Sequence, residues 1–250
     1  DFGLIDNNLI MNQQNLQKYV SDIVGGNYKM VLSGDSFDGM KFSKEGIITH
    51  PIVKEINLNN FPDSTKFSLS KEKVSVSFPE GSEIDPEKIG NVNIEPGDFY
   101  VQDYRSGGRT KIEVINEGGL IARDKKLYLQ EGGEIRIPDR EINSIKNLGT
   151  KEIEFSPFVE STNKGSISLG EKKLILNNFV DSKARIEFAN GAEQTFLGFS
   201  DKITMRTPNF GSTDFKWNGK KSIPIQGGVK DIQTVMQAEG FYQKGKIDGQ

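Results

Sequence analysis

Apolar and polar residues alternate along most of this chain, in short runs that begin at Tyr28. The alternation is clearest in residues 74–78, where two valines and a phenylalanine are separated by serines. Successive side chains of a strand point to opposite faces, so a period of two predicts strands with one buried face. Such runs cover residues 28–33, 40–42, 47–49, 57–59, 66–70, 74–78, 111–115, 127–129, 134–137, 151–155, 166–169, 174–176, 184–188 and 202–205.

Glycine-centred turns separate the runs after residue 111, as at 118–119, 132–133 and 149. Short strands broken by frequent turns are typical of a β-solenoid, in which each rung buries its inner face against its neighbours. We therefore predict a mainly β fold with an irregular β-solenoid (β-helix-like) body. The alternative is a β-sandwich, whose strands are usually longer, or two small β domains that divide near residues 100–110.

Helical periodicity is confined to the two ends of the chain. Leu9, Leu16 and Val20 recur at helical spacing within residues 8–24, and the glycines at 25–26 would end that helix. We expect a helical segment over residues 1–26, a β-rich body over residues 27–226, and a separate segment over residues 229–250 after a glycine hinge at 227–228.

The last segment, VKDIQTVMQAEGFYQKGKIDGQ, has the clearest helical stripe. Val229, Ile232 and Met236 share one face of a helix, and Gly240 stands where a helix ends on a residue with positive φ. A Phe-Tyr pair and an Ile-Asp-Gly turn follow. The purely structural interpretation is an amphipathic helix that covers the end of the β body.

The spacing also resembles the opening of the peptidoglycan-binding-like domain, a three-helix module attached to many cell-wall hydrolases. That family opens with V-x-x-[LIV]-Q-x-x-L-x-x-x-G-[FY]-[FY]-x-x-x-[IV]-D-G, and Met replaces the usual Leu here, a volume-conserving change. The residues in register are Val229, Ile232, Gln233, Met236, Gly240, Phe241, Tyr242, Gly245, Ile247, Asp248 and Gly249. The match spans only the start of such a domain, so the resemblance predicts a truncated helical module whose stripe is buried by further helices.

The resemblance implies peptidoglycan or a related cell-wall glycan as the partner, and an extracellular or cell-envelope location. We therefore expect a binding or scaffold protein that is attached to the cell wall through its C-terminal module. Two alternatives stay open. One is an enzyme that degrades the wall or another polysaccharide, with its catalytic part on the β body or beyond this chain; the other is a component of a phage or virion tail.

The composition of the chain argues against several classes of partner and kinds of site. The net charge of −3 in 250 residues argues against nucleic acid as a partner. Since no run of 18 apolar residues occurs, we expect no membrane span in this chain. The absence of cysteine excludes thiolate metal sites and cysteine nucleophiles. We expect no cofactor and no metal, and the sequence does not indicate an oligomeric state.

Few residues suggest catalysis, so we expect no enzyme activity within these residues and assign no catalytic residue. The only histidine, His50, has no second histidine for a metal site and no evident triad, which favours a structural role. Asp35 and Asp38 lie in a glycine-bounded turn, where aspartates usually bond the turn backbone and only rarely bind calcium. For the enzyme alternative, Asp103 with Arg105 is the candidate pair on the body.

Overall fold

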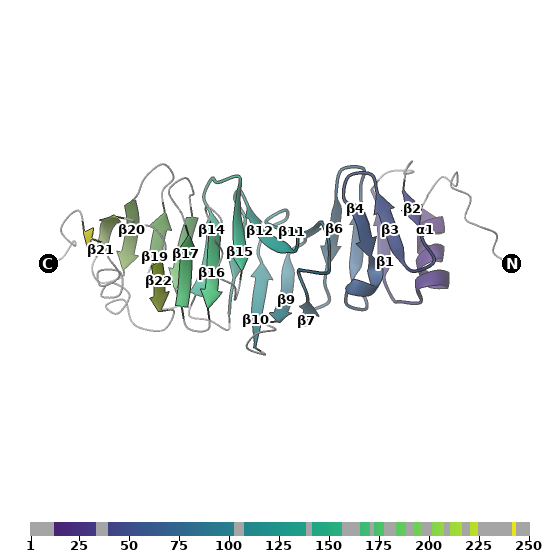
Figure 1. The fold of residues 1–250 in the computed structure, drawn as a ribbon, viewed down its shortest axis with the longest axis horizontal. Coiled ribbons are helices and arrows are strands. Elements are labelled where there is room, and N and C mark those ends of the chain that lie inside the picture. The colour runs from purple at the N-terminus through teal and green to yellow at the C-terminus, as the bar shows by residue number, and fades with distance from the viewer. Residues whose placement is uncertain are drawn as a thin grey trace.

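The computed structural model describes residues 13–33, 40–102, 108–138 and 142–156, and the strands beyond them up to residue 243. This described part is mainly β, with one short α-helix near the N-terminus, which confirms the predicted fold class at that level. The strands lie side by side along an elongated body, with α1 (Gln13–Tyr19) at one end and β21 (Gly211–Lys216) at the other (Figure 1).

The described strands form three open sheets, here called sheets I, II and III. Sheet I has ten strands, in the order β1 (Lys29–Leu32), β5 (Lys66–Leu69), β6 (Val74–Ser77), β8 (Val92–Ile94), β11 (Leu120–Arg123), β12 (Lys126–Gln130), β15 (Glu152–Ser156), β16 (Ser166–Gly170), β17 (Lys173–Asn177) and β22 (Lys221–Pro224). Sheet II also has ten, in the order β23 (Tyr242–Gln243), β21, β20 (Lys202–Thr207), β19 (Glu193–Phe196), β18 (Ala184–Phe188), β14 (Ile142–Asn147), β13 (Glu134–Arg136), β10 (Arg109–Val114), β9 (Gly97–Gln102) and β7 (Ser82–Ile84). Sheet III contains β2 (Lys41–Phe42), β3 (Ile47–His50) and β4 (Lys54–Asn57).

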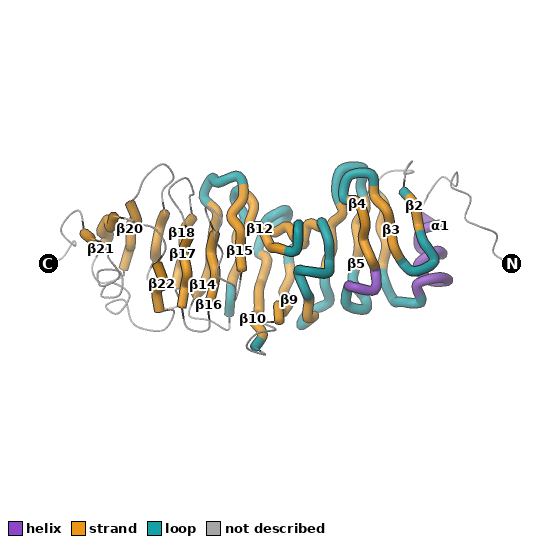
Figure 2. Tube along the Cα trace, in the orientation of Figure 1, coloured by secondary structure: helices purple, strands orange, loops and turns teal. Residues whose placement is uncertain are grey.

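The described strands do not form the predicted solenoid or any closed sheet. A solenoid pairs each strand in parallel with its equivalent in the next rung. Here consecutive strands mostly pair as antiparallel hairpins within one sheet, such as β5 with β6 and β9 with β10. The chain then crosses to the other sheet for its next strands, so the result is two open layers that extend together along the body (Figure 2).

One apolar core lies between the layers. Phe67 and Leu127 enter it from sheet I, Phe99 and Ile112 from sheet II, and Ile48 from sheet III, each at most 1% exposed. Complete burial of a side chain of this size contributes about 1.5–3 kcal/mol. A slip of one residue in any of these strands would turn its apolar face to water, so the core also fixes the register.

Sheet I contains an internal repeat in residues 67–77, 120–130 and 167–177. Each segment is a hairpin whose apolar residues pair in the same register, and each has a lysine at the first position of its second strand or directly before it. The apolar pairs are Phe67–Val76 and Leu69–Val74, then Leu120–Leu129 and Ala122–Leu127, then Ile167–Leu176 and Leu169–Leu174. Successive hairpins are three strands apart in the sheet, or about 14 Å at the usual strand spacing.

The N-terminal helix ends where the sequence predicts. After α1 the chain makes a π-helical turn, η1 (Val20–Val24), and Gly25 takes a left-handed conformation with φ of 71°. Leu16 and Val20 are fully buried and cover one end of the core. The first residues of the predicted helix, including Leu9, lie outside the described residues. The strand predicted at 57–59 was wrong, because Leu58–Asn60 is a turn of 3-10 helix, η2.

Candidate functional site

The residues that carry the wall-binding resemblance lie almost entirely outside the described part of the chain. These are Val229, Ile232, Gln233, Met236, Gly240, Phe241, Gly245, Ile247, Asp248 and Gly249. Tyr242 is described: it lies in β23 and pairs with Lys216 at the edge of sheet II. The resemblance predicts a helical module around Tyr242, whereas this two-residue pairing is a contact that an added strand would make. The helix and the glycan-binding surface therefore stay predictions.

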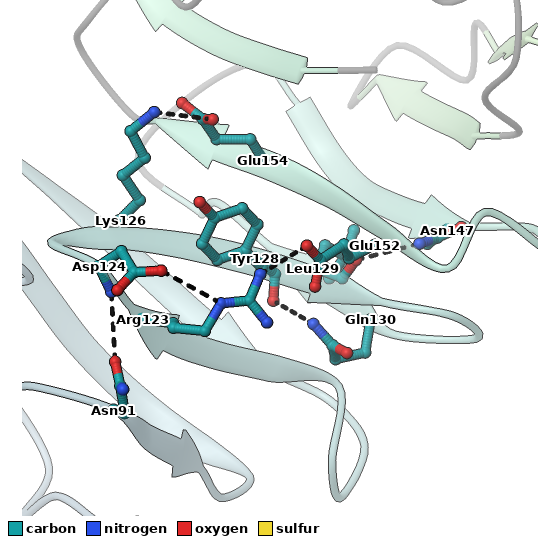
Figure 3. A network of polar contacts seen from close by, with 10 residues as sticks. All are labelled: Asn91, Arg123, Asp124, Lys126, Tyr128, Leu129, Gln130, Asn147, Glu152 and Glu154. Atoms are coloured by element: carbon teal, nitrogen blue, oxygen red, sulfur yellow. Dashed lines mark hydrogen bonds and ion pairs between the residues drawn. The ribbon is translucent and has the colours of Figure 1, made fainter. Parts of the chain in front are cut away.

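A polar cluster covers the outer face of sheet I around Tyr128 (Figure 3). The guanidinium carbon of Arg123 lies 4.5 Å from the centre of the Tyr128 ring, and its Nη2 donates to Glu152 Oε1 at 2.5 Å. Lys126 Nζ donates to Glu154 Oε2 at 3.0 Å. Tyr128 stands directly opposite Glu154 in the pairing of β12 with β15. Three strands thus hold five side chains in one ordered group.

One of these ion pairs involves a buried carboxylate. Glu154 is only 7% exposed, and a carboxylate removed from water to that degree is costly unless a cation lies beside it. Lys126 provides that cation. The pKa of Arg123 is raised, chiefly by the hydrogen bond that its guanidinium makes with Glu152. The charges of this cluster are therefore matched locally.

A second cluster of the same kind lies on the outer face of sheet II. The guanidinium carbon of Arg109 is 4.3 Å from the centre of the Tyr100 ring, and Lys111 Nζ lies 2.7 Å from Asp98 Oδ2. Tyr100 pairs with Lys111 across β9 and β10. The hydrogen bond to Asp98 is the main reason that the pKa of Lys111 is raised. Both layers thus carry a tyrosine with a guanidinium over its ring and an ion pair at its side.

The Tyr128 cluster does not have the arrangement of a glycosidase pair. A glycosidase pair needs two carboxyl groups that flank a bound sugar. Glu152 and Glu154 instead lie two residues apart on one strand and each binds a cation. Neither cluster was predicted from the sequence. The available signal was an outward tyrosine between two polar residues at alternate positions, as in Lys126, Tyr128 and Gln130.

His50 has the structural role that the sequence predicts. It is 1% exposed, and its Nδ1 accepts hydrogen bonds from the backbone N–H groups of Ile52 and Val53, both at 3.1 Å. Because Nδ1 accepts, the proton is assigned to Nε2, which donates to Ser70 O at 2.7 Å. All three bonds go to backbone, so the ring fastens a turn to the β5–β6 hairpin.

The structure does not place the other candidate residues. Asp35, Asp38, Asp103 and Arg105 lie outside the described residues. Within the residues that the structure describes, no group of three or more potential metal-binding side chains comes together. The same part of the chain contains no helix of the length and apolarity needed to cross a membrane.

Comparison with known proteins identifies no relative for this chain. No family model, no curated protein and no solved structure matches it.

Proposed function

We propose that this chain is a wall-attached spacer in the cell envelope or outside the cell. In this proposal, residues 229–250 begin a module that binds peptidoglycan or a related glycan, and the β body holds that module away from whatever the opposite end contacts. The observation that carries the proposal is the ordered match of residues 229–249 to the peptidoglycan-binding-like pattern, turn residues included.

The arrangement of the body supports the spacer role. The strands lie side by side along one elongated body, from β21 to α1 (Figure 1). The hairpin repeat adds length to sheet I in equal steps of three strands. The outer faces of sheets I and II carry ion pairs and the rings of Tyr128 and Tyr100. This polar surface is compatible with a hydroxyl-rich polymer beside it.

The test is co-sedimentation with purified peptidoglycan sacculi. We expect the natural chain to be retained, and Ile232→Asp with Met236→Asp to lower retention at least tenfold because charges would enter the buried stripe. Thr234→Asp, on the opposite face of the same predicted helix, is the matched control and should bind like the natural chain. Absence of retention of the natural chain, or equal retention of the stripe variant, would remove the proposal.

A further inference from the structure

The outermost strand of sheet I, β1, has one side paired with β5 and one side facing away from it. On the β5 side, the N–H groups of Lys29 and Ser33 donate to Thr65 O and Leu69 O at 3.2 and 2.9 Å. Backbone groups alternate in direction along a strand, so those of residues 28, 30 and 32 point to the free edge. Such an edge is a ready template for another strand.

Two glutamines of α1 occupy that edge. Gln13 Oε1 accepts from Leu32 N–H at 2.7 Å, and Gln13 Nε2 donates to Met30 O. Gln17 Oε1 accepts from Met30 N–H at 3.2 Å, and Gln17 Nε2 donates to Tyr28 O at 3.3 Å. Each side-chain amide therefore takes one donor and one acceptor of β1, as the backbone of a neighbouring strand would.

The fit has a simple geometric cause. Residues four apart on a helix lie on one face, about 6 Å apart along the axis. Residues two apart on a strand are separated by about 6.6 Å. Gln13 and Gln17 thus match the repeat of the edge groups of β1. Leu16 and Val20, both fully buried, hold the helix in place over the edge.

We infer that Gln13 and Gln17 form a strand-mimicking cap that closes a strand-acceptor site on β1, and that the uncapped edge pairs with β1 of a second copy of this chain. The helix and an incoming strand need the same four backbone groups, so cap and partner exclude one another. The capped protein stays monomeric, and the uncapped protein forms a dimer in which sheet I continues across a two-fold axis.

The β1 edge is self-complementary. An antiparallel pair centred on Met30 lets Met30 of each copy exchange both hydrogen bonds, with Tyr28 opposite Leu32 and Lys29 opposite Val31. No like charges stand opposite each other in that register. The strand at the other end of sheet I, β22, contains Pro224, which has no N–H to donate. Pairing of like edges closes the assembly as a dimer, whereas head-to-tail pairing with β22 would give a fibre.

The experiment compares Gln13→Leu/Gln17→Leu with the natural chain by sedimentation equilibrium and by amide hydrogen exchange. Gln14→Leu is the matched control, because Gln14 is an exposed glutamine of the same helix. We expect the weight-average mass of the double variant to rise toward twice that of the monomer with concentration, while the control and the natural chain stay monomeric. Adding Leu32→Pro to the double variant removes an edge N–H and should restore the monomer.

Every other outcome contradicts the inference. A monomeric double variant whose Met30 and Leu32 amides exchange freely would mean that the open edge does not accept a second copy. A monomeric variant whose amides stay protected would mean that the glutamines do not form the cap. If the double variant does not fold, Gln13→Glu/Gln17→Glu decides the question by the same readouts; it keeps the two acceptors and replaces the two donors with negatively charged carboxylate oxygens that repel Met30 O and Tyr28 O.

Discussion

Asn147 offers the sharpest test of how the two layers are joined. It lies at the end of β14 in sheet II with no exposed surface. Its Nδ2 donates to Leu129 O of sheet I at 3.0 Å (Figure 3) and also to Thr150 O at 2.8 Å. Its Oδ1 accepts from the N–H groups of Gly149 at 3.2 Å and Thr150 at 2.9 Å. The amide thus fills its hydrogen-bonding capacity and links the sheets where the chain crosses between them.

The change Asn147→Ala removes all four bonds. A buried neutral hydrogen bond contributes about 1 kcal/mol net, and a buried group left without a partner costs about 1–3 kcal/mol. The groups of Gly149 and Thr150 belong to a half-buried turn and regain water in part, whereas the hydrogen bond to Leu129 O is buried. We therefore expect a loss of about 3 kcal/mol in the free energy of unfolding, or roughly 6–12 °C in melting temperature for a chain of this size.

The assay is urea unfolding followed by circular dichroism, with Asn59→Ala as the matched control. Asn59 is exposed and its side chain donates one hydrogen bond, to Glu45 O at 2.8 Å, so its replacement should cost about 1 kcal/mol or less. Asn147→Asp keeps the shape but cannot donate to the two carbonyls when ionised, and we expect it to destabilise as much as alanine at neutral pH. If Asn147→Ala cost no more than Asn59→Ala, Asn147 would not join the layers.

Three further predictions concern stability. Burial raises the pKa of Tyr19 to about 12, above its ordinary value of 10. The neutral phenol therefore contributes its full stability below pH 10, and this stability is lost as pH rises toward 12. Tyr19→Phe should make the unfolding free energy fall less steeply between pH 10 and 12. The buried hydroxyl of Ser75 has no hydrogen-bond partner among the described residues. Ser75→Ala should therefore increase the free energy of unfolding by about 0.5–1 kcal/mol and raise the melting temperature slightly. A lower melting temperature would contradict this. A Cβ at Gly133 would lie 2.4 Å from Gly119 O, whereas a Cβ at Gly132, where φ is +75°, would meet open space. Gly133→Ala should therefore lower the melting temperature more than Gly132→Ala. The reverse order would show that backbone strain at Gly132 outweighs the clash at Gly133.

Local patterns in the sequence were sufficient to predict most strands. Alternation predicted 74–78 and 184–188, and β6 and β18 lie there with inward residues such as Val76 and Ile186 fully buried. The run at 57–59 failed for a local reason. The Asn57 side chain accepts from Asn59 N–H at 3.0 Å, and this cap begins a 3-10 turn in place of a strand.

The arrangement of the strands could not be predicted from the same patterns. A strand in a solenoid and a strand in a two-layer fold both show alternation, and only the distant pairing partner distinguishes them. β15, for example, pairs with β12 on one side and in parallel with β16 on the other. The repeat of 67–77, 120–130 and 167–177 was present in the sequence. The unequal intervals between its copies, 53 and 47 residues, hide it from a search at one fixed period.

The polar residues with the most specific roles were the hardest to recognise. Gln13 and Gln17 have the spacing of an ordinary solvent-facing helix surface, and Asn147 before a glycine-containing turn is typical of a surface loop. What sets them apart is the backbone that lies opposite, and that backbone comes from β1 and β12. A single sequence carries no local signal for such partners.

The most direct test of the central claim is a titration of the isotope-labelled chain with soluble peptidoglycan fragments, followed residue by residue in amide NMR spectra. If residues 229–250 begin a wall-binding module, helical chemical shifts are expected over residues 229–239, with ligand-induced shift changes confined to residues 229–250. Extended-strand chemical shifts from 229 to 243 with no response to the fragments would contradict it, because the segment would then be an added strand of sheet II.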